Sequence, residues 1–150
     1  MIKTILLGEK EEKFKASAAT SILFRRLFKE DIQAILADYS KNTKEIRKLQ
    51  EDLAAVRELP DSDEKSAKME EITAKFMPLN DFVADFFPKF AYITWLEANH
   101  TAADLFKKLT EQDYFEWLMK YEAKDFTMIV GELLNLWTEN ARTAVKSKNL

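Results

Sequence analysis

The side chains best suited to catalysis or metal binding are few in this sequence. One histidine occurs, His100, and Glu97 precedes it by three residues, a spacing that puts two ligands on one face of a helix. A di-metal carboxylate site needs a second such pair and two further glutamates, but the chain has no second histidine. We therefore interpret His100 as a residue near a helix C-terminus, where the helix dipole favours its partial charge, and we expect no metal.

Other reaction classes lack their characteristic residues as well. The chain has no cysteine, which excludes a thiolate nucleophile, a disulfide and a cysteine-bound metal. Only two glycines occur, which excludes the glycine-rich loops that bind dinucleotides and phosphates. The carboxylates are spread over polar helix faces, so no pair is favoured as acid and base. We expect that the protein is not an enzyme and binds no cofactor.

Composition limits the function further. The 150 residues, 47% hydrophobic and 33% charged, suit one folded domain with a substantial core. With 23 basic and 26 acidic side chains, the net charge of −3 disfavours general binding to nucleic acid. The apolar run in residues 2–7 is interrupted and shorter than the ~7–15 residues of a secretory signal, and no window approaches the ~18 of a membrane span. These features predict a cytoplasmic protein without membrane contact.

The first seventeen residues have the alternating pattern of β-structure. Residues 2–7 and 12–16 flank a charged connection that contains Gly8, which predicts a short antiparallel hairpin over residues 1–17. Such a hairpin is marginally stable alone, so its apolar face must pack on helices or on another subunit. Its open edge could also pair between copies, and we assign self-association to the region around Ile5 and Phe14.

Helical periodicity begins near residue 20. A single amphipathic helix is predicted over residues 20–39, capped by Thr20 or Ser21. Residues 40–75 differ, with eight basic and nine acidic side chains and no aromatic residue. Apolar residues still recur there every three or four positions, which predicts a charged helical hairpin inserted into the body; an exposed structural insertion is favoured over a partner-binding arm.

The second half predicts several aromatic-rich helices. One is capped by Asn80 or Asp81, and Pro88 within it predicts a kink or a break. Thr101 and Thr110 each precede an aspartate by three residues, close to the pattern of a capping box. The expected fold is mostly α: a single domain of residues 1–150, in which a hairpin precedes a small helical bundle of residues 18–39 and 76–145.

The predicted helices contain more aromatic residues than a single core-facing stripe on each helix needs. Core packing is the default interpretation, but helices that are apolar over much of their circumference can also bind a partner. We predict one partner-binding surface that comprises five of the 18 aromatic residues: Phe86, Phe87, Tyr114, Phe115 and Trp137. If alanine at Phe115 and Trp137 unfolded the protein, these residues would belong to the core instead.

Several segments, in a consistent order, resemble a known family. Residues 14–20 (FKASAAT) and 23–31 (LFRRLFKED) look like the opening of tail assembly chaperones from long-tailed phages and prophages of Gram-positive bacteria. The later segments FAY at 90–92, YFEWL at 114–118, DF at 125–126 and LLNLW at 133–137, followed by Asn140, are similar to that family too. The resemblance covers nearly the whole chain except residues 40–75.

The resemblance implies a function in phage tail morphogenesis. A member of this family binds the tape measure protein, keeps that long helical chain soluble and helps recruit tail tube subunits around it. It also implies a tendency to form homo-oligomers, a location in the cytoplasm of the bacterial host, and absence from the mature virion. High charge density around aromatic stripes suits such a chaperone, because its apolar surface must stay soluble when unoccupied.

A second hypothesis is a small helical regulator of a mobile element, either DNA-binding or an anti-repressor. That function would need a helix whose basic side chains gather on one face. The helix over residues 20–39 has Arg25, Arg26 and Lys29, but acidic residues such as Glu30 and Asp31 accompany them. The helix therefore has an electrostatic field of mixed sign, and the chaperone is the preferred hypothesis.

Overall fold

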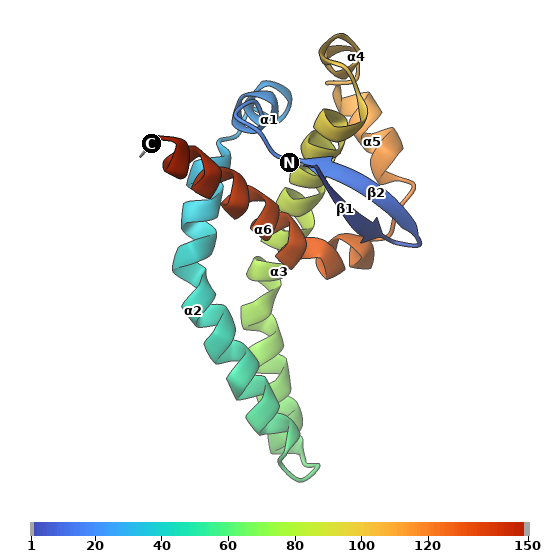
Figure 1. The fold of residues 1–150 in the computed structure, drawn as a ribbon. Coiled ribbons are helices and arrows are strands. Elements are labelled where there is room, and N and C mark those ends of the chain that lie inside the picture. The colour runs from blue at the N-terminus through green and yellow to red at the C-terminus, as the bar shows by residue number, and fades with distance from the viewer. Residues whose placement is uncertain (1, 149–150) are drawn as a thin grey trace. The chain divides into compact units, whose positions relative to one another are not determined.

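The chain forms a two-stranded antiparallel sheet followed by helices (Figure 1). This computed structural model describes the backbone of residues 2–148, and side chains in that range except those of residues 41–44, 46, 50, 76–82 and 141–148. The elements are β1 (Ile2–Leu7), β2 (Lys10–Lys15), α1 (Thr20–Phe28), α2 (Ile32–Arg57), α3 (Asp63–Asn99), α4 (Ala102–Lys107), α5 (Glu111–Leu118) and α6 (Ala123–Lys148). The predicted fold class, mostly α with a short N-terminal β-hairpin, is confirmed.

The β-hairpin turns through two residues, Gly8 and Glu9. Leu7 pairs with Lys10 at the turn, and Ile2 pairs with Lys15 at the open end. Gly8 has a φ of 65°, a left-handed conformation that glycine adopts without steric cost. Alternate side chains of β1 and β2 face the helices, and the inward apolar ones are fully or nearly fully buried: Ile5, Leu7 and Phe14.

The predicted single helix over residues 20–39 is wrong, because α1 ends at Phe28 and α2 begins at Ile32. Lys29 terminates α1 in the left-handed conformation (φ 60°), and its backbone N–H donates to the carbonyl oxygen of Arg25. The start of α1 also differs from the prediction. Ala19 occupies the N-cap position without a side-chain cap, while the hydroxyl of Thr20 accepts a hydrogen bond from the backbone N–H of Ser17.

Of the kink or break predicted at Pro88, the break is wrong, since α3 is one helix from Asp63 to Asn99. Pro88 is buried among aromatic neighbours in this helix, and this packing offsets the backbone donor that proline lacks. The two predicted caps are confirmed: Thr101 accepts from the backbone N–H of Asp104 and Thr110 from that of Asp113. Asn80 and Asp81, the other predicted caps, have side chains outside the described set.

The chain divides into two compact units, of which the first contains residues 1–32 and 84–150. Its core joins the inner face of the hairpin to one face each of α1, α3 and α6. The buried large side chains of this core include Phe24, Phe87, Phe90, Tyr92, Leu96, Leu133 and Leu136. Chain segments far apart in the sequence therefore share one apolar interior.

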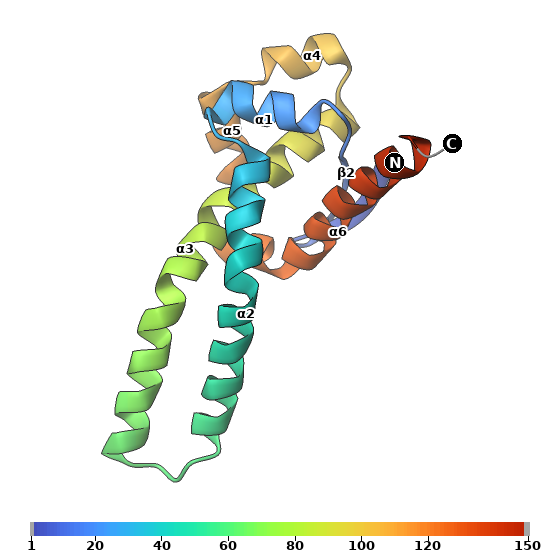
Figure 2. The same cartoon turned by 90° about the vertical axis from the view of Figure 1, so that its left-hand side faces the viewer.

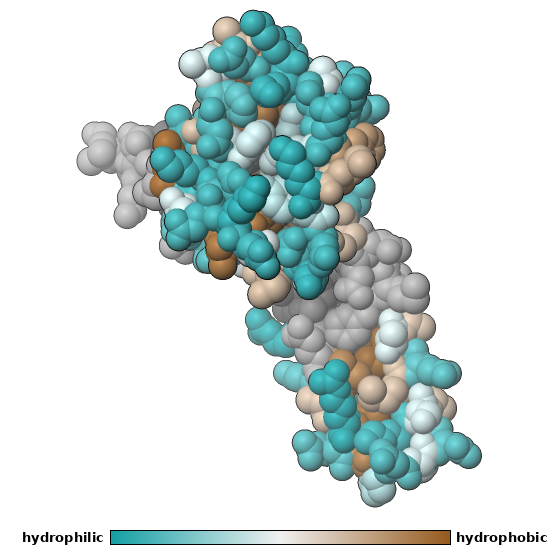
Figure 3. All heavy atoms as spheres, turned by 90° about the vertical axis from the view of Figure 1, so that its right-hand side faces the viewer, coloured by the Kyte–Doolittle hydropathy of each residue, from teal (hydrophilic) through white to brown (hydrophobic). Residues whose placement is uncertain are grey.

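The second unit, residues 33–83, is a helical hairpin made by most of α2 and the first part of α3 (Figure 2). Its apolar seam is thin, because only Leu49, Val56 and Ile72 are buried among the described side chains, with Leu53 and Met69 packed against them. Figure 3 shows hydrophobic side chains along the pair, flanked by hydrophilic ones. Ion pairs at a spacing of four residues line the exposed face of α3, for example Lys68 with Glu64.

Candidate protein-binding surface

Three of the five aromatic residues predicted to contact a partner are buried. Phe86 and Phe87 are 2% and 0% exposed, and Tyr114 is 5% exposed. Aromatic rings enclose them: Phe24 lies 5.7 Å from Phe86 between ring centroids, and Phe28 lies 5.0 Å from Tyr114. These residues are core residues, so the expectation that all five form one exposed surface is corrected. Their burial in α3 and α5 is stabilised by packing of rings from α1.

The other two predicted contact residues differ from each other. Phe115 is 54% exposed on α5 and is available to a partner. Trp137 is half-buried on α6, and its ring centroid lies 6.0 Å from that of Phe90 in an edge-to-face arrangement. The two residues assigned to self-association, Ile5 and Phe14, are buried beneath the hairpin, because its apolar face packs on the helices. The apolar side chains on the outward face of β1 are instead Ile2 and Leu6.

Large hydrophobic side chains are exposed on three short helices of the first unit. Among the described residues of α1, α4 and α5 they are Ile22, Phe106, Phe115 and Met119. Phe115 and Met119 are one helical turn apart, so they share a face of α5 and its C-cap. Sequence patterning missed Ile22 and Phe106, because a single apolar residue outside the main stripe is common on helices.

Ile22 on α1 and Phe106 on α4 belong to one surface. The guanidinium carbon of Arg26 lies 5.2 Å from the ring centroid of Phe106, a cation–π contact that holds α1 beside α4 (Figure 2). Ile22 precedes Arg26 by one turn on the same side of α1. Ile22 is 67% exposed and Phe106 is 51% exposed. We call Ile22, Arg26 and Phe106 the α1–α4 surface.

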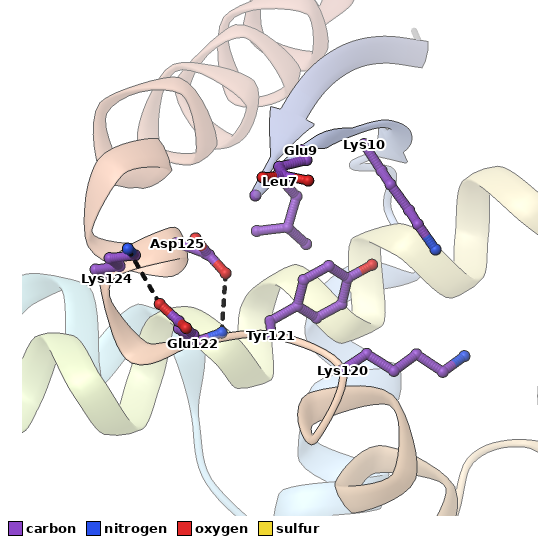
Figure 4. Close-up of a pocket in the computed structure, with 9 residues that line it drawn as sticks. Leu7, Glu9, Lys10, Lys120, Tyr121, Glu122, Lys124 and Asp125 are labelled. Atoms are coloured by element: carbon purple, nitrogen blue, oxygen red, sulfur yellow. Dashed lines mark hydrogen bonds and ion pairs between the residues drawn. The ribbon is translucent and has the colours of Figure 1, made fainter.

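A pocket of about 480 Å³ lies between the hairpin turn and the segment that joins α5 to α6 (Figure 4). It is lined by Leu7, Gly8, Glu9, Lys10, Lys120, Tyr121, Glu122, Lys124 and Asp125. Within it the Lys124 ammonium lies 3.1 Å from the Glu122 carboxylate, and Asp125 accepts a hydrogen bond from the backbone N–H of Glu122. Three lysines and three carboxylates line the pocket, so its charges balance and select neither an anion nor a cation.

Tyr121 connects this pocket to the hairpin through Glu12. Burial, together with the hydrogen bond and charge of Glu12, raises the pKa of Tyr121 to about 12. The same Glu12 carboxylate accepts a hydrogen bond from the indole N–H of Trp95 at 3.0 Å. Because Tyr121 stays protonated near neutral pH and donates to Glu12, it acts as a structural link and not as a base.

A partly buried carboxylate, Glu97 on α3, lies at the start of α1. It accepts hydrogen bonds from the hydroxyls of Ser17 and of Thr20, the latter at 2.6 Å. Burial raises the pKa of Glu97, and the two hydroxyl donors and Lys15 offset part of that increase. Glu97 is therefore engaged with the hairpin–α1 connection, while the ring of His100 packs edge-on against Trp95, 5.1 Å away between centroids.

Among the described residues, no group of three or more histidine or acidic side chains is arranged to hold a metal ion. Within that same part of the chain, no helix has the length and hydropathy to span a bilayer. Searches of protein-family models, curated proteins and solved structures found no match to this chain.

Proposed function

We propose that this protein is a tail assembly chaperone of a long-tailed phage or prophage, which binds the tape measure protein and keeps it soluble. In this proposal it helps recruit tail tube subunits, self-associates in the bacterial cytoplasm and is absent from the mature virion. The resemblance of residues 14–31 and 90–137 motivates the proposal. The mostly helical fold behind an N-terminal hairpin agrees with it.

The observation that carries the proposal is the exposure of Ile22, Phe106, Phe115 and Met119 on α1, α4 and α5. Exposed apolar groups that gather on one surface are typical of protein-binding sites, and Ile22 and Phe106 are joined through the contact of Arg26 with Phe106. Each such contact would be weak alone, but many chaperone copies along one extended partner would bind it tightly through avidity. The many charged residues of the chain would keep the unoccupied surface soluble.

Co-expression tests this function directly. The chain would be produced together with the tape measure protein encoded beside it, and the soluble fraction and co-purification would be measured at moderate salt. We expect the tape measure protein to be soluble only in the presence of this chain and to purify with it. A control co-expression would replace this chain with an unrelated charged helical protein of similar size.

Two outcomes would contradict the proposal. The tape measure protein could remain insoluble, or it could be soluble without binding this chain. Binding of the purified chain to operator DNA would then support the regulatory alternative, although the Arg25 guanidinium already lies 3.5 Å from the Asp31 carboxylate.

A further inference from the structure

Three basic side chains occur in the same segments as the exposed apolar residues of the α1–α4 surface. Lys29, one residue beyond α1, donates from its ammonium group to the backbone carbonyl of Arg26 at 2.9 Å, which places it beside that arginine. Lys107 follows Phe106 in the last turn of α4. Ile22 and Phe106 therefore have Arg26, Lys29 and Lys107 in the same segments, in a chain of net charge −3.

The carboxylates in the same segments have other partners. Asp31 pairs with Arg25, and Glu30 pairs with the ammonium of Lys89 at 2.8 Å. Asp104 accepts a hydrogen bond from the hydroxyl of Thr101 and is part of the α4 cap. Arg26, Lys29 and Lys107 make no described ion pair with an acidic side chain, so their positive charge remains available to a ligand.

We propose that the α1–α4 surface binds an acidic amphipathic helix of the partner protein. Apolar side chains of that helix would cover Ile22 and Phe106, and its flanking carboxylates would pair with Arg26, Lys29 and Lys107. This inference rests on the proposed function, because it identifies the surface and the kind of partner segment through which a helical client is held.

The apolar area and the charge together favour this ligand over the two alternatives. A nucleic acid would pair with the basic groups but would leave Ile22 and Phe106 uncovered, because its backbone offers phosphates and sugars. A purely apolar helix would cover both residues without neutralising the cations. A helix that carries apolar groups every three or four residues, with glutamates on either side, satisfies both requirements.

The test uses the full chain and two synthetic peptides, each of about 20 residues. The first is a helical peptide with leucine on one face and glutamate on the flanks; the second replaces every glutamate with lysine. Binding would be measured by fluorescence anisotropy at about 50 mM and about 300 mM salt, with a duplex DNA oligonucleotide as a third ligand. We expect binding to the acidic peptide alone, weakened by salt.

Two substitutions test whether the acidic peptide binds at the α1–α4 surface. Arg26→Glu and Ile22→Ser are each expected to weaken acidic-peptide binding by about tenfold, the range for a residue central to an interface. The matched control is Met128→Ser, because Met128 is 81% exposed on α6 and is not part of the α1–α4 surface. Circular dichroism of each variant would establish that it is folded.

Several results would overturn the inference. These are failure to bind the acidic peptide, equal binding of the lysine peptide, tighter binding of DNA, or unchanged affinity after Arg26→Glu. Concentration-dependent self-association that disappears with Ile22→Ser would instead assign the surface to a second copy of this chain. None of these measurements needs the tape measure protein, so their failure is distinguishable from failure of the co-expression experiment.

Discussion

The carboxylate of Glu97 on α3 and the hydroxyl of Thr20 at the start of α1 form a 2.6 Å hydrogen bond. They are 77 residues apart in the sequence, so this bond fixes the start of α1 against α3. Thr20 also accepts the backbone N–H of Ser17, and Ser17 donates its own hydroxyl to Glu97. One carboxylate thereby satisfies the polar groups of the connection between the hairpin and α1.

The Glu97 carboxylate should make stability depend on pH. Since burial raises its pKa in the folded state, the folded protein binds the proton more tightly than the unfolded chain does. Its stabilising contribution is full below the unfolded pKa of about 4.3 and is lost as pH rises through the folded pKa. We expect Glu97→Gln to lose less stability than the wild type between about pH 4 and pH 7 in urea unfolding. An unchanged pH dependence would contradict this, and Glu132→Gln on the exposed side of α6 is the control.

Replacement of the two glycines by alanine should have opposite effects on the free energy of unfolding. Gly8 has a φ of 65°, and an added Cβ would lie 3.3 Å from a carboxylate oxygen of Asp125. We expect Gly8→Ala to lower the free energy of unfolding by about 1–2 kcal/mol. Gly131 lies exposed in α6 with open space around an added Cβ, so Gly131→Ala should raise it by about 0.5–1 kcal/mol. Urea denaturation measures both, and equal effects at the two sites would contradict the described turn.

Burial separates the aromatic residues that the sequence grouped together. Phe87→Ala should lower the free energy of unfolding by about 3–5 kcal/mol, because Phe87 is fully buried. Phe115→Ala should change it by less than about 0.5 kcal/mol, since more than half of that side chain is exposed. If the proposed function is correct, Phe115→Ala should still reduce co-purification of the tape measure protein. A large loss of stability at Phe115 would place it in the core instead.

The helical hairpin of residues 33–83 should open more easily than the first unit. Its seam has only three buried apolar residues among the described side chains, so little apolar contact stabilises the pair. We expect Ile72→Ala to speed amide hydrogen exchange in residues 45–75 and to leave protection in α6 unchanged. Leu59→Ala, a truncation at an exposed position between the helices, is the control. Uniform loss of protection across the chain would show that the two units unfold together.

Local patterns predicted the hairpin and two helix caps because each depends on a few adjacent residues. Alternation on either side of Gly8 predicted the hairpin, although β2 begins at Lys10 and not at residue 12. Threonine three residues before aspartate predicted the caps at Thr101 and Thr110. The end of α1 was missed because Lys29 adopts the left-handed conformation that glycine usually marks. The continuity of α3 through Pro88 was missed because Pro88 is buried in the core, and its burial depends on the tertiary fold, which the local sequence does not encode.

The candidate surface was harder to predict for a related reason. Periodicity identifies apolar helix faces but does not say which neighbouring element covers them. Phe86 and Phe87 are covered by rings from their own and neighbouring helices, whereas Phe115 is left open. Ile22 and Phe106 become a surface only because the contact of Arg26 with Phe106 joins α1 to α4. Long-range packing of this kind can be identified only from the three-dimensional structure.

The antiparallel pairing of α2 with α3 in the helical hairpin restricts how this segment can change in length during evolution. An insertion or deletion in one helix alone would move its apolar residues out of register with the partner helix. Paired changes of about seven residues, two turns in each helix, would keep Leu49, Val56 and Ile72 facing the seam. Homologues should therefore differ here by such paired steps, or by lacking the hairpin altogether, while residues 84–140 keep a constant length.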